Sequence, residues 1–194
     1  MTGESSMSRK SSLRWDSVFS ANDWQRLLIM PFDMFIFPSV RSDKNLRLLS
    51  IDVQQPLYSM VDRGFEDLMS WGYDRGIDSM TYGSMGAGIL SGKIRSVPSF
   101  EKNDLRLNFY DVYKEPKFSK IMELLKVMDS IADGHNVPVG QVALNWSTQK
   151  EYVGTALVGV RSIEHADENC KTFDWKLTEE EMKILDSKIE ECAL

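Results

Sequence analysis

The chain has 194 residues, a length that fits one domain with a sizeable core or at most two domains. Its formal net charge is -6, which argues against a general nucleic-acid surface or an anionic-membrane surface, because phosphate contacts need clustered Lys and Arg. The two cysteines, Cys170 and Cys192, follow no metal-ligand or C-x-x-C spacing, so we expect structural or incidental thiols in a reducing compartment and no metal site.

The first 50 residues differ in character from the rest of the chain. Residues 1–14 are rich in Ser, Lys and Arg, but no apolar core follows them, so they do not form a secretory signal and we expect a cytoplasmic protein. Residues 27–40, LLIMPFDMFIFPSV, are too short to span a bilayer and are interrupted by Pro31, Asp33 and Pro38. We expect residues 1–50 to be an atypical N-terminal segment, partly disordered, with no membrane association.

A regular pattern begins at residue 51. The β-rich run IDVQQPLY, residues 51–58, predicts a strand, and IDSMTY, residues 77–82, predicts a second one. The segment between them predicts a helix whose packed face is formed by Phe65, Leu68, Met69 and Tyr73. Strand, helix and strand in this order predict a parallel βαβ unit.

The stretch TYGSMGAGILSGK, residues 81–93, starts where the second of these strands ends. It has the glycine density of a phosphate-binding loop, but neither G-x-G-x-x-G nor G-x-x-x-x-G-K-[ST] can be laid over it. The spacing alone therefore does not assign a ligand to this stretch.

The sequence of the second half of the chain predicts a long loop at residues 96–116, four helices and one more strand. The packed face of the first helix, closed by Gly134, consists of Ile121, Leu124, Leu125, Met128 and Ile131. A second helix starts near Pro138 and carries Val142, Ala143 and Trp146, and TALVGV, residues 155–160, predicts a buried strand. RSIEHADENC, residues 161–170, predicts a loop that opens into a helix.

The last helix is predicted by LTEEEMKILDSKIEEC, residues 177–192. Thr178 and Glu181 have the spacing of a capping box, which marks its N-terminus. Met182, Leu185 and Ile189 recur at helical spacing and supply its packed face. The run of glutamates is typical of a solvated helix face rather than of a catalytic acid.

Three motifs together resemble the C-terminal half of an aldo-keto reductase, a TIM-barrel family that reduces carbonyls with NADPH. DVQQPLYSMVDRG, residues 52–64, resembles the sixth barrel strand and its following turn; residues 81–93 resemble A-Y-S-P-L-x-x-G-L-L-T-G-K; VGVRSIEHADEN, residues 158–169, resembles G-x-R-S-x-E-Q-x-x-E-N. The resemblance implies an α/β fold of the (β/α)8 barrel type, here an incomplete barrel formed by residues 51–194.

The resemblance also implies residues that bind the cofactor NADPH (NADP+). They are Gln55, Tyr82, Gly83, Ser84, Met85, Gly86, Lys93, Gly159, Arg161, Ser162, His165, Glu168 and Asn169. Tyr82 would stack on the nicotinamide ring and Gln55 would bind its carboxamide. Residues 83–86 would follow the pyrophosphate, where small residues allow the backbone to approach closely, and Lys93 would point at a cofactor phosphate.

The other end of the implied cofactor site opens a helix after the last strand. Helix N-termini attract anions, and Arg161 adds a charge that suits the 2′-phosphate of NADPH. Ser162 either binds the same phosphate or caps its helix. His165 stands where the family has Gln or Arg beside the ribose phosphate, while Glu168 and Asn169 match the adenine-binding pair. Taken singly, each of these residues has an ordinary structural explanation; their joint spacing favours the cofactor.

The family's catalytic Tyr, Lys, Asp and His all lie in the first half of the barrel. The G-x-Y-G-x-S-E context of the tyrosine is absent here, and the two histidines, His135 and His165, lie in the second half. SVFSANDWQRL, residues 17–27, resembles the segment after strand five, but Val18 replaces its Asn. A complete barrel needs about 250 residues. We therefore predict no catalytic residue in this chain.

Three interpretations remain open at this point. The leading one is an aldo-keto reductase-like chain that carries the cofactor-binding half, so that action on a small-molecule carbonyl requires another chain or a longer gene product. The second is a noncatalytic nucleotide-binding or protein-interaction remnant, and the third is a fragment that does not fold alone. Because an unclosed barrel exposes strand edges, we also predict self-association or aggregation.

Overall fold

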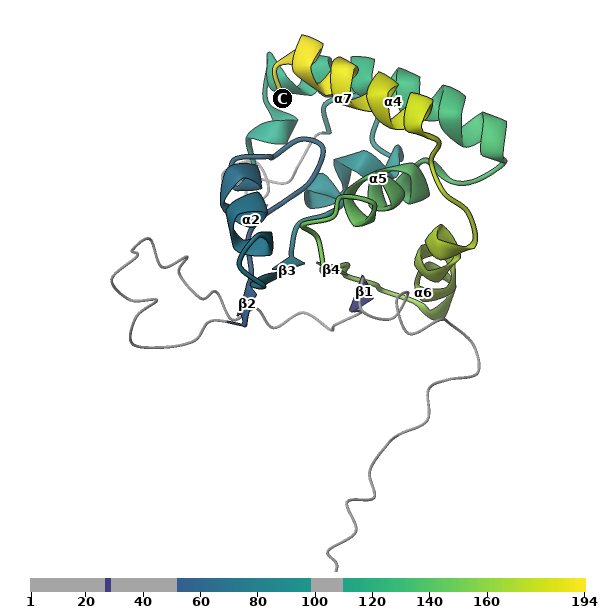
Figure 1. Ribbon diagram of the computed structural model, residues 1–194. Helices are drawn as coiled ribbons and strands as arrows, with labels where there is room; N and C mark the ends of the chain where they lie inside the picture. Colours follow the sequence, from purple (N-terminus) through teal and green to yellow (C-terminus); the bar gives the residue numbers. More distant parts are fainter. Residues whose placement is uncertain (1–26, 29–51, 99–109) are drawn as a thin grey trace, which may run out of the picture.

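The computed structural model describes residues 27–28, 52–98 and 110–194 (Figure 1). In this part of the chain, four short strands form one sheet in the order β1-β4-β3-β2, and every pairing is parallel. The strands are β1 (Leu27–Leu28), β2 (Val53–Gln54), β3 (Asp78–Thr81) and β4 (Thr155–Leu157). The parallel strands expected near 51–58, 77–82 and 155–160 are confirmed, but each is shorter than its sequence pattern.

Pro56 explains why β2 is so short. Asp78 N donates to Asp52 O and Tyr82 N donates to Pro56 O, so alternate residues of this segment direct their backbone groups at β3. Proline has no N–H to donate in return, and it therefore interrupts the ladder after Gln54. Pairing resumes only as an isolated bridge between Leu57 and Tyr82.

β1 pairs with β4, at the edge of the sheet opposite β2. The sequence pattern contained no prediction of this strand, which lies inside the apolar run 27–40. The other expectations for residues 1–50, including the resemblance of residues 17–27 to the family, fall outside the described residues.

Helix α2 (Glu66–Tyr73) connects β2 and β3, which confirms the βαβ unit. Its expected packed face is wrong in part: Met69 is fully buried, but Phe65 and Tyr73 are 36% and 50% exposed. The reason is that α2 has only 8 residues, so a single turn, with Met69 and Gly72, reaches the core. Phe65 precedes the helix at its N-cap.

Three longer helices lie over one side of the sheet and form the main core: α4 (Lys117–His135), α5 (Val139–Thr148) and α7 (Glu179–Cys192) (Figure 1). The five apolar residues predicted for α4 are all buried. However, α4 ends at Asn136, which adopts a left-handed conformation with φ of 53°, and not at Gly134. Helix α5 starts after Pro138 as expected and is buried on every side.

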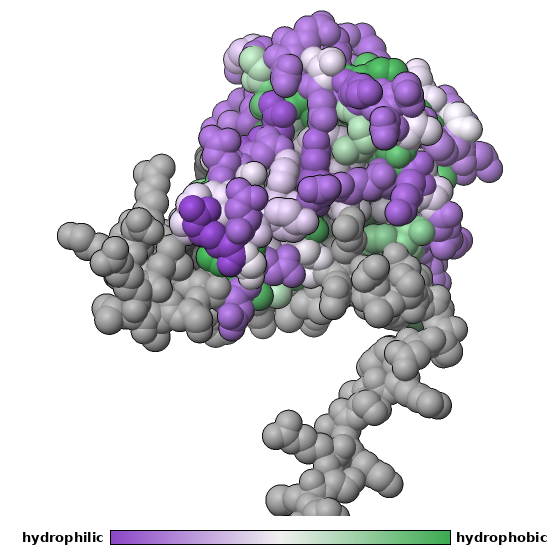
Figure 2. Space-filling model, in the orientation of Figure 1, coloured by the Kyte–Doolittle hydropathy of each residue, from purple (hydrophilic) through white to green (hydrophobic). Residues whose placement is uncertain are grey.

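Helix α7 begins with the predicted capping box, in which Thr178 and Glu181 bind each other's backbone N–H groups. Leu185 and Ile189 are buried, and Met182 is half-buried against the core. The face in view in Figure 2, over α7 and α4, is mostly hydrophilic. The glutamates of α7 therefore belong to a solvated helix face.

Short helical segments complete the described chain. η1 (Gly86–Ser91) follows β3, η2 (Asp111–Tyr113) precedes α4, and η3 (Lys171–Asp174) follows α6 (Ile163–Cys170). Unlike the other helices, α6 has no buried residue, and Ile163 in its first turn is 78% exposed. Residues 99–109, which make up most of the long loop expected at 96–116, are not among the residues that the structure describes.

Candidate functional site

The carboxyl ends of β2, β3 and β4 bring the candidate residues to one edge of the sheet. Gln55 follows β2 directly, Tyr82 follows β3, and Gly159 lies two residues after β4. Because β2 pairs with β3 and β3 pairs with β4, the three loops are neighbours. In open or closed parallel sheets this edge is the usual place for ligands.

The glycine-rich stretch is a chain of tight turns that packs against the loop after β2. Gly83 has φ of +72°, and a Cβ there would collide with the Leu57 Cδ1 atom. Gly86 has φ of +54° and is buried; its Cβ would lie 2.7 Å from Val61 Cγ2. The Tyr113 hydroxyl donates to Ala87 O at 2.8 Å and holds the turn from the far side. The left-handed backbone, together with this packing, therefore favours glycine at positions 83 and 86 without reference to a ligand.

Ser84 differs from its neighbours in the stretch. It is 1% exposed, and its hydroxyl has no hydrogen-bond partner. Met85 and Gly83 are half-buried, so the stretch offers its backbone, rather than the Ser84 side chain, to the outside.

Tyr82 is half-buried at the carboxyl end of β3. Burial, followed by the negative charge of Asp62 and the nearby Tyr110, raises the pKa of its phenol above the ordinary value. None of these effects on the pKa of Tyr82 comes from a positively charged group. Tyr82 is therefore suited to present a neutral aromatic ring and unsuited to donate a proton near neutral pH.

The N-terminus of α6 has the geometry that its sequence predicts. Ser162 is the N-cap, and its hydroxyl accepts a hydrogen bond from the His165 N–H at 3.3 Å. Arg161, Ser162 and His165 are exposed, and within the described part of the chain the Arg161 and His165 side chains form no hydrogen bond or ion pair. Ser162 therefore caps its helix, one of the two roles considered for it.

The first turn of α5 connects the glycine-rich stretch to α6. A Cβ on Gly140 would lie 3.0 Å from Met85 Cε, so the stretch touches α5 closely. One residue later, Gln141 Nε2 donates to Glu168 O at 2.7 Å. Glu168 and Asn169 are half-buried on α6, whereas Lys93, at the end of the stretch, is exposed.

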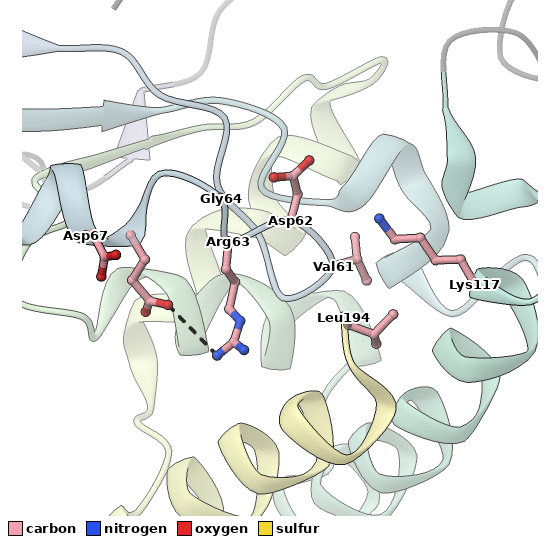
Figure 3. Close-up of a pocket in the computed structure, with 8 residues that line it drawn as sticks. Val61, Asp62, Arg63, Gly64, Asp67, Lys117 and Leu194 are labelled. Atoms are coloured by element: carbon pink, nitrogen blue, oxygen red, sulfur yellow. Dashed lines mark ion pairs between the residues drawn. The ribbon is translucent and has the colours of Figure 1, made fainter. Parts of the chain in front are cut away.

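Neither of two hollows formed by the described residues is lined by the candidate residues as a set. A groove of about 720 Å3 lies between the end of α4, the start of α5 and α6, and of the candidate residues only Glu168 lines it. A second hollow of about 390 Å3 is formed by the loop after β2, Lys117 and Leu194 (Figure 3). In it Arg63 faces Glu66 at 3.9 Å, and the buried Arg63 Nε has no partner.

A buried cluster of hydrogen bonds, which the sequence did not predict, lies behind β2. The hydroxyl of the fully buried Tyr58 donates to Glu66 Oε1 at 2.9 Å and lies 3.0 Å from the Tyr152 hydroxyl, which donates to the same oxygen. Burial raises the pKa of Tyr58 and of Tyr152 far above the ordinary value. Neither phenol is an available acid, and we assign the cluster a structural role.

Two kinds of site are absent from the residues that the structure describes. No group of three or more His, Cys, Asp and Glu side chains there is placed to hold a metal ion. None of the helices in those ranges is long and apolar enough to cross a membrane. Cys170 and Cys192 are free thiols, and burial raises the pKa of Cys170.

Comparison with known proteins identifies the family. The sequence profile of the aldo/keto reductase family matches residues 19–190. The chain belongs to the aldo/keto reductase family. The match begins 32 residues before the boundary at residue 51 that the motifs suggested, and it includes part of the segment 17–27.

Individual aldo/keto reductases agree with the family assignment. Aldo-keto reductase str7 of Strobilurus tenacellus is 27% identical over 144 residues, covering 74% of this chain and 40% of that protein. Aldo-keto reductase yakc of Schizosaccharomyces pombe, whose name specifies NADP(+), is 26% identical over 110 residues, covering 57% of this chain and 32% of that protein. The chain thus spans well under half the length of these relatives.

A solved aldo/keto reductase supports the fold. The glycerol dehydrogenase AKR11B4 of Gluconobacter oxydans superposes with a TM-score of 0.65 at 26% identity, over 72% of this chain and 42% of that one. Such structures are (β/α)8 barrels, so the described sheet and helices correspond to part of a barrel.

Proposed function

We propose that this aldo/keto reductase chain binds NADPH at the carboxyl ends of β2, β3 and β4, as the cofactor-binding half of a cytoplasmic carbonyl-reducing oxidoreductase. The observation that carries the proposal is the start of α6, where Arg161 is exposed beside a capped helix N-terminus and has no ion-pair partner among the residues that the structure describes. Free N–H groups and the helix dipole favour an anion there, and a guanidinium strengthens the preference.

The preference for NADPH over NADH rests on the 2′-phosphate. Arg161 and His165 lie on either side of the Ser162 cap in the sequence, and both residues are exposed to solvent. Glu164 limits the positive field, since the hydrogen bond from Ser162 lowers the pKa of its carboxyl and keeps it charged. The name of the relative yakc, which specifies NADP(+), is in line with this preference.

For the nicotinamide end of the cofactor, this chain offers fewer contacts than for the phosphate end. Tyr82 supplies a neutral aromatic face for the nicotinamide, and Gln55, half-buried, supplies an amide at the adjacent strand end. Strands corresponding to the first half of the barrel would enclose the ring from the other side. We therefore propose weak NADPH binding by the isolated chain, with carbonyl reduction only when the missing half is supplied.

The second candidate function is noncatalytic nucleotide binding or protein interaction. It is favoured by the tyrosines: the pKa values of Tyr58, Tyr82 and Tyr152 are all raised. A general acid near neutral pH would need the opposite shift, produced by a neighbouring cation.

Calorimetric titration of the full chain with NADPH and NADH tests the proposal. We expect tighter binding of NADPH, and we expect Arg161→Ala to weaken NADPH binding about 10–100-fold, because a hydrogen bond to a charged group is worth about 1.5–3 kcal/mol. Arg75→Ala is the matched control, since Arg75 lies on Trp71 at the end of α2 and should change nothing. Equal affinities for the two cofactors, or an unchanged Arg161→Ala variant, would refute the phosphate site.

A further inference from the structure

One face of the sheet and one of its edges have no cover among the described residues. The side chains of Gln54 and Ser79 bind each other at 3.1 Å beneath α2, and Ser79, Thr81 and Ala156 are buried, so these residues mark the helix-covered face. Successive side chains of a strand point to opposite faces. The residues of the other face, called the inner face here, are Val53, Gln55, Asp78, Met80, Tyr82, Thr155 and Leu157.

The inner face is suited to burial. Six of its seven side chains are uncharged, although the whole chain carries a formal net charge of -6. Val53 is 49% exposed and Asp78 is also exposed, whereas the other five are half-buried. Asp78 shares this face only at the amino end of β3, where its carboxylate accepts the Ser79 N–H at 2.9 Å.

The outer edge of β2 has backbone groups that can form hydrogen bonds with another strand. The backbone groups of Asp52 and Pro56 face β3, as their hydrogen bonds show, so those of Val53 and Gln55 face away from the sheet. An unpaired strand edge is a template for another strand. The sheet ends in β1 on its other side, with the same strand direction.

We infer that two copies of this chain associate about a two-fold axis, with the β2 edge of each copy beside the β1 edge of the other. The four parallel strands found in residues 27–28, 52–98 and 110–194 are half of the eight in the family's barrel. A two-fold rotation about the barrel axis keeps all eight strands parallel. A barrel of this type has eight strands and a total register shift (shear) of 8 residues around the barrel, and both numbers can be divided equally between two copies.

A second copy fits this surface better than an unrelated partner. It brings a β1 edge in the required direction, and it brings an inner face whose only charged side chain, Asp78, lies at the amino end of β3. The rotation leaves no free edge and places both copies of Gln55 and Tyr82 at the same end of the assembly. The association does not depend on NADPH, so its test is carried out without nucleotide.

Light scattering of the full chain over about 1–100 μM is the first measurement. We expect a defined particle with the mass of two chains. Val53→Lys should raise the dissociation constant roughly 100-fold or more, because symmetry buries the new charge at two seams and an unpaired buried charge is costly. Ile184→Lys is the matched control: Ile184 is 52% exposed on α7, away from the sheet, and this change should leave the dimer intact.

Hydrogen exchange provides a second readout that does not depend on mass. The outward amides of Val53 and Gln55 should exchange slowly at concentrations where the dimer forms and quickly in the Val53→Lys variant. A monomer whose Val53 amide is protected would show that another segment of the same chain covers the edge. That result, or an open-ended series of larger particles, would overturn the two-fold assembly.

Discussion

The hydrogen bonds around Glu66 give a direct test of how the loop after β2 is held. Tyr58 and Tyr152 both donate to Glu66 Oε1, and their hydroxyls lie 3.0 Å apart. In Tyr58→Phe the carboxylate keeps Tyr152 as a partner and no large cavity forms. We therefore expect the free energy of unfolding to fall by about 1.5 kcal/mol, the lower end of the range for a hydrogen bond to a charged group.

The double-mutant cycle with Glu66→Ala makes this expectation specific. In Glu66→Ala the two hydroxyls still bind each other, so a single buried donor is left without a partner, at about 1–3 kcal/mol. Loss of an acidic residue from the first turn of α2 adds about 0.3–1 kcal/mol. In that background Tyr58→Phe should change stability much less than in the native chain, giving a coupling of about 1 kcal/mol.

Urea unfolding followed by circular dichroism and tryptophan fluorescence is the assay, and coincidence of the two signals tests for a two-state transition. Tyr73→Phe is the control, since Tyr73 is exposed at the end of α2, and we expect a change within about 0.5 kcal/mol. If Tyr58→Phe has the same effect with and without Glu66, the hydroxyl does not act through the carboxylate and the assigned role is wrong.

Three further predictions concern stability, pH and catalysis. Gly134→Ala should raise the free energy of unfolding by about 0.5–1 kcal/mol in the same urea assay, because this exposed position in α4 has open space around it and an unstrained backbone. A loss of stability in this variant would contradict the helical geometry at Gly134. Burial would raise the pKa of Glu181, but hydrogen bonds from the Thr178 N–H and from His135 outweigh it and lower the pKa. The stability that the charged Glu181 carboxylate contributes is therefore present above the ordinary Glu pKa, and it is lost as the pH falls through the pKa of Glu181 in the folded protein. The difference in urea midpoint between the native chain and Glu181→Gln should thus shrink below about pH 4. A difference that does not change with pH would refute this coupling between protonation and folding. Finally, the full chain with NADPH and a reactive aldehyde should show no protein-dependent loss of reduced-nicotinamide absorbance, because positioned acid catalysis is worth about 10²–10⁴-fold and the described tyrosines near the site have raised pKa values; turnover abolished by Tyr82→Phe would contradict this.

The elements that the sequence predicted well are those whose signal is local. The five apolar residues of α4 recur at helical spacing, and the capping box of α7 needs only Thr178 and Glu181. The short α2 was harder, because Phe65 and Tyr73 fit the helical period but lie beyond the single turn that meets the core. The pairing of β1 with β4 joins residues more than 120 positions apart, and no local pattern encodes it.

In the candidate site, too, local sequence signals were predictive and long-range contacts were not. The motifs located Tyr82, Arg161 and the other cofactor candidates through their spacing, and the parallel strands bring their loops to one edge. The Tyr58–Glu66–Tyr152 cluster was not foreseeable, since Tyr152 comes 86 residues after Glu66 and belongs to a turn without a motif. The early end of β2 was foreseeable from Pro56, because a strand that pairs there needs an N–H.

The conformation of Gly83 also limits which residues this position can hold. The family pattern that residues 81–93 resemble has a serine there, whereas here the backbone at Gly83 is left-handed, with φ of +72°, and a Cβ would meet the end of the Leu57 side chain. The Leu57 side chain can rotate away, but a left-handed backbone disfavours any residue that has a Cβ. A smaller residue at position 57 would therefore not by itself make serine acceptable at position 83, because the turn would first have to adopt another conformation.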